Sequence, residues 1–135
     1  GQKGALCIAA TIFMARNKYS KSQIREYLIR AFGYKELMIP LNDLRDGHIN
    51  ECTCQNTVPH SVVCFLESND FESAVRLAKS FGGDTDTMAA MTGSIAEAYY
   101  GGVPKYLVSY TQERLDEDSL KICASFYDKI RKKEF

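Results

Sequence analysis

A segment of small and apolar residues, flanked by a glycine pair at each end, most constrains how this chain folds. Gly82-Gly83 and Gly101-Gly102 bound residues 85–100, which contain no proline. Glycines turn the backbone in ways closed to other residues and end helices readily, so we expect a buried helix over Thr85–Tyr100. The small residues that keep this helix thin are Ala89, Ala90, Gly93, Ala96 and Ala98. Neighbouring helices are therefore expected to pack closely against it.

The rest of the sequence has helical periodicity, without strand-like alternation or an internal repeat. Further helices are expected near residues 3–17, 20–33, 41–45, 59–66, 70–81, 104–115 and 116–135. Residues 34–56 lack a clear period and are expected to form a long irregular segment around the short helix at 41–45. Because the helices and loops are uneven in length, the sequence predicts an all-α fold, an irregular orthogonal helical bundle. Residues 1–135 are expected to form a single all-helical domain or half-domain.

Capping residues indicate several helix ends. Ser20 and Gln23 have the spacing of a capping box, and Asn69 and Glu72 are expected to form a second one. Pro59 suits the first turn of its helix. The buried face of the first helix is expected to consist of Ala5, Ile8, Ala9, Ile12 and Phe13.

Charge and apolar run lengths exclude two classes of partner. Seventeen basic and seventeen acidic residues cancel, so no global field draws the chain to nucleic acid or to an anionic membrane. The longest apolar run, Ala5–Ala15, is too short and too interrupted to span a bilayer. We therefore expect neither a nucleic-acid partner nor a membrane partner.

Five cysteines, an odd number at irregular spacing, argue against a disulfide framework. Cys7, Cys64 and Cys123 fall on apolar faces of expected helices and are interpreted as reduced core residues, which favours a cytoplasmic location. The alternative of a zinc site does not match a standard ligand spacing. Its four candidate ligands are Cys52, Cys54, His60 and Cys64.

Four oxygen-bearing side chains occupy consecutive positions just before the thin helix, in the run Asp84-Thr85-Asp86-Thr87. A helix start needs only one or two such residues as caps, and carboxylate and hydroxyl oxygens are ligands that Mg²⁺ prefers. Asp84, Asp86 and Thr87 can converge on one point beyond the helix end, so they are candidate metal ligands. The alternative is a plain N-cap at Asp84 or Asp86, with the threonines filling the turn.

The segment Gly82–Gly101 resembles the C-terminal signature of the ADP-ribosylglycohydrolase family. The resemblance extends upstream to Asp70–Ala78, Thr57-Val58-Pro59 and Lys3-Gly4-Ala5, so it covers most of the chain. It implies the C-terminal part of the ADP-ribosylglycohydrolase fold. It also implies a hydrolase that cleaves the glycosidic bond between ADP-ribose and a protein side chain or small acceptor.

The same resemblance implies roles for individual residues. Asp84, Asp86 and Thr87 would bind Mg²⁺, as part of a pair of ions, with Asp84 and Asp86 contributing to catalysis. Cys54, Gln55 and Asn56 would line the ligand pocket within an irregular loop over residues 50–57. Tyr99 and Tyr100 are candidates to stack on adenine, although core packing is the more common role of tyrosines at a helix end.

Members of this family usually contain an N-terminal half with a second acidic cluster of Thr-Asp-Asp type and an assisting glutamate, and this sequence has no Asp-Asp dipeptide. We therefore expect the 135 residues to be inactive alone. The alternatives are a non-catalytic docking module that completes a site with a separate N-terminal half, and a degenerate remnant. Self-association is also expected, through a stripe on the thin helix formed by Met88, Met91, Ile95 and Tyr99.

Overall fold

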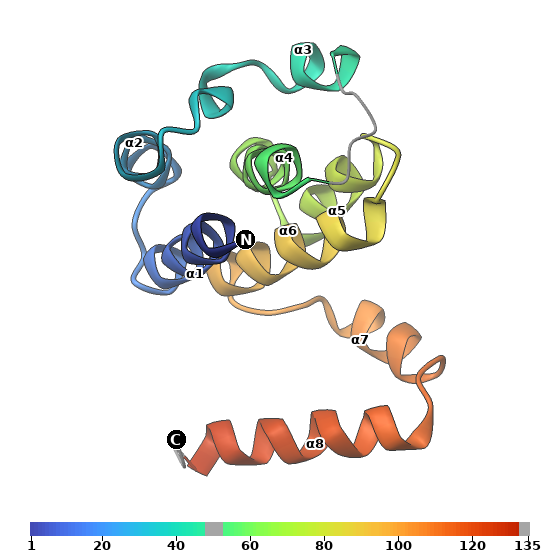
Figure 1. Cartoon of the computed structure of the whole chain (residues 1–135). Helices are drawn as coiled ribbons and strands as arrows, with labels where there is room; N and C mark the ends of the chain where they lie inside the picture. Colours follow the sequence, from blue (N-terminus) through green and yellow to red (C-terminus); the bar gives the residue numbers. More distant parts are fainter. Residues whose placement is uncertain (48–52, 133–135) are drawn as a thin grey trace. The chain divides into compact units, whose positions relative to one another are not determined.

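The computed structural model describes residues 1–47 and 53–132, and the chain divides into two compact units, Gly1–Gly102 and Val103–Phe135. Over the described residues, the regular structure is entirely helical, which confirms the expected all-α fold (Figure 1). The elements of the first unit are α1 (Gln2–Arg16), α2 (Lys21–Phe32), the 3₁₀ helix η1 (Lys35–Met38), α3 (Leu41–Asp46), α4 (Cys54–Glu67), α5 (Phe71–Lys79) and α6 (Thr85–Tyr100). The second unit contains α7 (Lys105–Gln112) and α8 (Glu117–Lys132).

Helix α4 forms the centre of the first unit. Figure 1 shows it between α1, α5 and α6 on one side and the α2–α3 segment on the other. Ten consecutive residues, 57–66, are buried, so α4 is covered around its whole circumference. Phe65 of α4, Ile24 of α2 and Ile95 of α6 are fully buried in one hydrophobic core. This core holds α6 and its N-terminal turn against the rest of the unit.

Capping boxes open two helices of the first unit. The Ser20–Gln23 capping box opens α2 as expected. The second capping box consists of Asp70 and Ser73, so the prediction of Asn69 and Glu72 is wrong by one position. The box forms at Asp70 because its carboxylate accepts the backbone N–H of Ser73 at 2.7 Å, while the Ser73 hydroxyl accepts the N–H of Asp70.

The expected buried face of α1 is confirmed for Ile8 and Ile12, which pack against the core, and wrong for the other three residues. The buried residues are Gly4, Cys7, Thr11, Met14 and Ala15, whereas Ile8 and Ile12 are half-buried and Ala5, Ala9 and Phe13 are exposed. Apolar residues surround this helix on every side, so their periodicity does not identify which side faces the core.

Helices α1, α4 and α6 begin on the same side of the first unit. Gly4 of α1 lies beside Val58 and Cys54 at the start of α4. The Thr92 hydroxyl of α6 donates a hydrogen bond of 3.0 Å to the Ser61 carbonyl at mid-α4, and the Tyr100 hydroxyl donates one of 2.9 Å to the Ser68 carbonyl where α4 ends. Because α4 and α6 meet middle to middle and end to end, their N-terminal ends lie together.

The second unit has no buried side chain among its described residues. Its exposed apolar residues include Ile122 (70% exposed) and Phe126 (54%) on α8. Cys123 is also exposed, so the expectation that it is a core residue is wrong. Asp116 accepts the backbone N–H of Ser119 at 2.8 Å and caps α8 as expected. No described helix is long and apolar enough to cross a membrane.

Candidate functional site

The turn into α6 places two carboxylates at the start of this helix. Gly82 and Gly83 have φ values of 77° and 67°, which favour glycine and reverse the chain direction. Asp84 is the N-cap residue, but its side chain makes no capping hydrogen bond. Asp84 therefore occupies the N-cap position of the N-cap alternative, but its side chain does not cap the helix.

The side chains of Asp84 and Asp86 lie within hydrogen-bonding reach of each other. Interaction with the Asp84 side chain is the largest cause that holds the pKa of Asp86 below its usual value, followed by the backbone N–H groups of Thr87 and of Asp86 itself. Asp84 is half-buried, whereas Asp86 and Thr87 are exposed. The two carboxylates therefore share one exposed position at the N-terminus of α6.

This donor set fits part of a Mg²⁺ site. Two carboxylates and a neighbouring hydroxyl are hard oxygen ligands, but Mg²⁺ takes six ligands in an octahedral arrangement. Within residues 1–47 and 53–132, no group of three or more His, Cys, Asp or Glu side chains is arranged to hold a metal ion. Asp84 and Asp86 thus need ligands from elsewhere to form a site of ordinary composition.

The zinc alternative finds no support in the described residues. Cys64 is buried, desolvation raises the pKa of its thiol to about 12, and no group of three or more potential metal ligands is found among the described residues. Cys54 is exposed on the first turn of α4. Cys52, the fourth candidate ligand, lies outside the described residues.

Cys54, Gln55 and Asn56 form the first turn of α4, so the expectation that they belong to an irregular loop is wrong. The helix already starts at Cys54, and Pro59 lies inside it instead of in the first turn. Thr53 precedes this turn as the N-cap residue, and its carbonyl accepts the Asn56 N–H at 3.1 Å. Residues 50–52 of the expected loop lie outside the described residues.

A groove of about 300 Å³ connects the start of α4 with α3. Asn56 and His60 of α4 line it together with Asp43 and Leu44 of α3. His60 is buried and stacks on Phe81, with ring centroids 5.1 Å apart. Phe81 directly precedes Gly82, so His60 links this groove to the turn that carries Asp84. Sequence reasoning considered His60 only as a zinc ligand, because the Phe81 contact joins residues that are distant in sequence.

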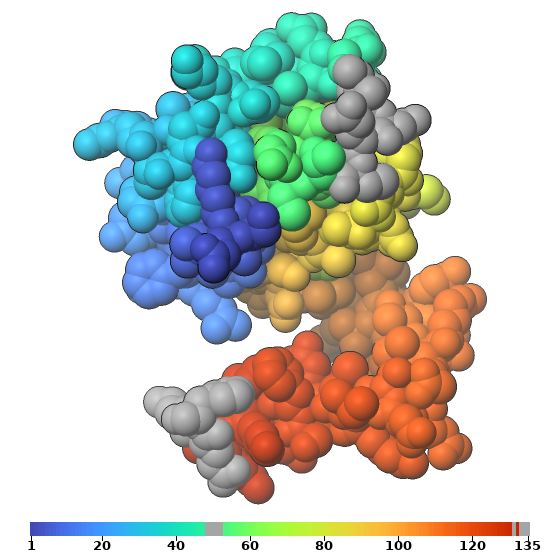
Figure 2. Space-filling view, viewed as in Figure 1, coloured from blue at the N-terminus to red at the C-terminus, as the bar shows by residue number. Residues whose placement is uncertain are grey.

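The expected site residues therefore lie on one side of the first unit. Figure 2 shows the dark-blue start of α1, the green start of α4 and the yellow residues around the start of α6 on the same face. Tyr99 and Tyr100 are at the other end of α6. Tyr99 packs edge-on against Phe65 at 5.1 Å between centroids, which confirms the core-packing interpretation for Tyr99, whereas the half-buried Tyr100 donates its hydroxyl to the Ser68 carbonyl.

Comparison with known proteins identifies relatives of the chain. A sequence profile of the ADP-ribosylglycohydrolase family matches residues 2–134. The chain is also similar to ADP-ribosylhydrolase ARH3 from Homo sapiens, Bos taurus and Mus musculus, with 39% identity over 56 residues in each case. That similarity covers 33% of this chain and 15% of the length of each relative. No solved structure matches the chain significantly.

Proposed function

This chain belongs to the ADP-ribosylglycohydrolase family, and we propose that it forms part of a Mg²⁺-dependent hydrolase that cleaves the glycosidic bond between ADP-ribose and a protein side chain or small acceptor. The observation that carries the proposal is the pairing of the Asp84 and Asp86 carboxylates at the start of α6. Core packing of α4 against α6 fixes the backbone behind this pair. The oxygen-ligand chemistry of the pair and the family membership point to the same reaction class.

Asp84, Asp86 and Thr87 supply oxygen ligands for the metal. When bound there, Mg²⁺ would act as a Lewis acid that activates water and would orient the ribose diol. The Asp84 side chain makes no capping hydrogen bond, and the Asp86 carboxylate lies beside the backbone N–H groups of Thr87 and of Asp86 itself. Both residues thus contribute to catalysis through the metal.

The start of α4 and the carboxylate pair suit a ligand that has both anionic groups and metal-binding hydroxyls. The N-terminal end of α4 carries the positive end of its helix dipole, which would attract the diphosphate of ADP-ribose. Cys54 and Gln55 are exposed and Asn56 half-buried at the start of α4, where they can contact the ligand. The same side of the unit therefore offers one position for cations and another for phosphates.

The 135 residues hold only part of this site, so we propose that they are inactive alone. Two carboxylates do not satisfy a pair of Mg²⁺ ions, and no further acidic group stands beside them in the described residues. Activity then depends on a further segment that supplies the missing acidic ligands. The many free thiols of the chain, including the buried Cys7 and Cys64, favour a reducing, cytoplasmic setting for this assembly.

Calorimetric titration with MgCl₂ and ADP-ribose tests the proposal. We expect weak Mg²⁺ binding that strengthens when ADP-ribose is present and disappears in Asp86→Asn. The matched control is Asp128→Asn, which removes an exposed carboxylate from α8 and should leave Mg²⁺ binding unchanged. In a parallel assay, the isolated chain should release no ADP-ribose from modified protein. Mg²⁺ binding of equal strength in Asp86→Asn would refute the assignment.

A further inference from the structure

Helix α8 of the second unit is amphipathic, and its apolar side is exposed. This side consists of five exposed residues, which we call the α8 face: Ile122, Cys123, Phe126, Tyr127 and Ile130. Ile122 is 70% exposed and Phe126 54%, although both side chains are large and apolar. Residues of the face recur at intervals of three and four, which is typical of contacts between two helices. The α8 face therefore has the pattern of a helix-packing surface.

Charged residues occupy the opposite side of α8 in a fixed order. The first turn is acidic, with Glu117 and Asp118. The C-terminal part is basic, with Lys129 and Lys132. Over the whole helix, three acidic and four basic residues nearly cancel, so α8 lacks the strong positive charge of helices that bind anionic membranes. The order of the charges, and not their sum, therefore discriminates between possible partners.

A second copy of α8 matches this order when the two helices run antiparallel. One register places Cys123 of each copy opposite Phe126 of the other, so that the two apolar faces meet. The same register brings three acidic side chains toward three basic ones: Glu117 toward Lys132, Asp118 toward Lys129, and Asp128 toward Lys121. A parallel pairing would instead bring each charge toward the same charge of the other copy, and it would align the two helix dipoles unfavourably. Charge therefore selects the antiparallel pairing.

The contacts that these charges make within α8 do not prevent such a pairing. Lys121 lies 3.3 Å from Asp118 and 3.8 Å from Glu117. All three side chains are at least 70% exposed, so these ion pairs contribute little and can exchange for ion pairs between two helices.

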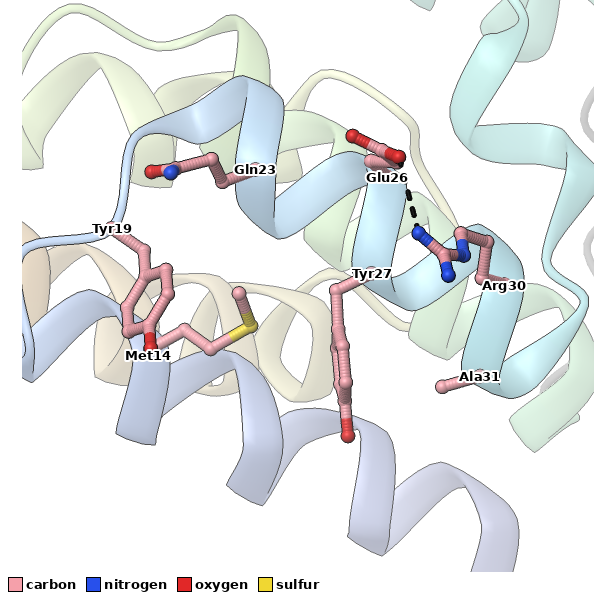
Figure 3. Close-up of a pocket in the computed structure, with 7 residues that line it drawn as sticks. All are labelled: Met14, Tyr19, Gln23, Glu26, Tyr27, Arg30 and Ala31. Carbon is pink, nitrogen blue, oxygen red and sulfur yellow. Dashed lines mark hydrogen bonds and ion pairs between the residues drawn. The ribbon is translucent and has the colours of Figure 1, made fainter.

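The first unit has another exposed apolar surface, but its charges do not select a partner. A groove of about 520 Å³ lies between α1 and α2, and Figure 3 shows Met14 there between the rings of Tyr19 and Tyr27. Glu26 and Arg30 on its rim already form an ion pair with each other. The groove thus lacks the charge order that α8 has, and it provides a control surface for the experiments below.

We propose that the α8 face is the interface of a two-fold symmetric dimer, in which α8 of a second copy of this chain packs antiparallel against it. Such an interface is isologous, so each apolar contact and each ion pair occurs twice. Helix α8 has 16 residues and is about 24 Å long, which lets the apolar faces of the two copies interdigitate over several turns. The interface does not include Asp84 or Asp86, so it goes beyond the proposed function and does not depend on it.

Sedimentation equilibrium of the whole chain tests the dimer. We expect a reversible equilibrium between monomer and dimer. Phe126→Ser should raise the dissociation constant of the dimer by about tenfold or more, because it removes a large apolar contact from each copy. Phe13→Ser is the matched control, since Phe13 is 65% exposed but lies on α1 beside the groove of the first unit. This control should dimerise like the original chain.

Two outcomes of this experiment would overturn the proposal. One is a monomer at every concentration, which would mean that no second copy covers the α8 face. The other is a dimer that Phe13→Ser separates and Phe126→Ser does not, because the groove of the first unit would then hold the copies together.

Charge reversal tests the antiparallel pairing. Glu117→Lys combined with Asp118→Lys should weaken the dimer by about tenfold at low salt, because lysines would then approach the basic end of the other copy. Adding Lys129→Glu and Lys132→Glu to the same chain should restore the original affinity, although the fourfold variant has unfavourable charges at both ends of the helix dipole. An unchanged dissociation constant in the twofold variant, or no recovery in the fourfold variant, would overturn the proposed pairing.

Discussion

Substitution of Gly93 by alanine should stabilise the protein, although Gly93 is buried in the middle of α6. A Cβ built at this position meets Val75 Cγ2 at 3.7 Å and Phe71 Cζ at 3.8 Å, which are ordinary van der Waals contacts. Alanine favours a helix interior over glycine by about 0.8–1.0 kcal/mol, and partial burial of the new methyl group adds a few tenths more. We therefore expect the free energy of unfolding to rise by about 1 kcal/mol, and Tm by about 4–8 °C.

Gly4→Ala provides the matched comparison within the same unit. A Cβ at Gly4 would lie 3.0 Å from Val58 Cγ2, and Val58 is a stiff, buried side chain that can yield little space. The overpacking cost, about 1–3 kcal/mol, should cancel or exceed the gain in helix propensity. Urea denaturation followed by circular dichroism measures both changes. A loss of stability in Gly93→Ala, or a larger gain in Gly4→Ala, would refute the reasoning from Cβ contacts.

Three further predictions concern polar and thiol groups of the first unit and α8. Lys21→Met should lower the free energy of unfolding by about 1–2 kcal/mol, because the Lys21 ammonium donates to the Ser68 carbonyl and the Tyr100 hydroxyl and lies over the Phe65 ring. Urea titration measures the change, and an unchanged midpoint would contradict this prediction. Iodoacetamide should label the exposed Cys54 and Cys123 in the folded protein, and Cys7 and Cys64 only in urea, as mass spectrometry of the labelled peptides will show. Stability should fall as pH rises above 9, because burial raises the pKa of Cys7 to about 11 and that of Cys64 to about 12 while both thiols ionise earlier in the unfolded chain. Each thiol lowers the free energy of unfolding by up to about 1.4 kcal/mol per pH unit in this range, so Cys64→Val should make the decrease with pH less steep. An equally steep decrease in that variant would refute the role of the Cys64 thiol.

The sequence predicts the bounds of α6 and the opening of α2 because the signals are local. Glycine pairs on both sides of residues 85–100, and the Ser20–Gln23 box, act through neighbouring backbone groups. The orientation of α1 depends instead on which of two apolar sides the other helices cover. The α6 stripe expected to mediate self-association also depends on which side the other helices cover. Met88 and Ile95 of this stripe are already buried within the first unit.

At the candidate site, too, features set by neighbouring residues can be predicted from the sequence, whereas contacts between distant residues cannot. The run from Asp84 to Thr87 identifies the carboxylate pair, because the glycines and the helix start that position it are adjacent in sequence. The contact of His60 with Phe81 joins residues 21 positions apart and has no sequence signal of its own. The start of α4 at Cys54 also escapes prediction, because packing on all sides carries a helix across Pro59.

Paramagnetic broadening by Mn²⁺ in place of Mg²⁺ tests the central claim, a metal position at the start of α6, most directly. In NMR spectra of the ¹⁵N-labelled chain, substoichiometric Mn²⁺ should broaden the backbone amides of residues 83–88 first, because they surround Asp84 and Asp86. The amides near Asn56 should follow, and Asp86→Asn should abolish the effect in both regions. Broadening that instead begins around Asp116 and Asp118, or that persists unchanged in Asp86→Asn, would contradict the account.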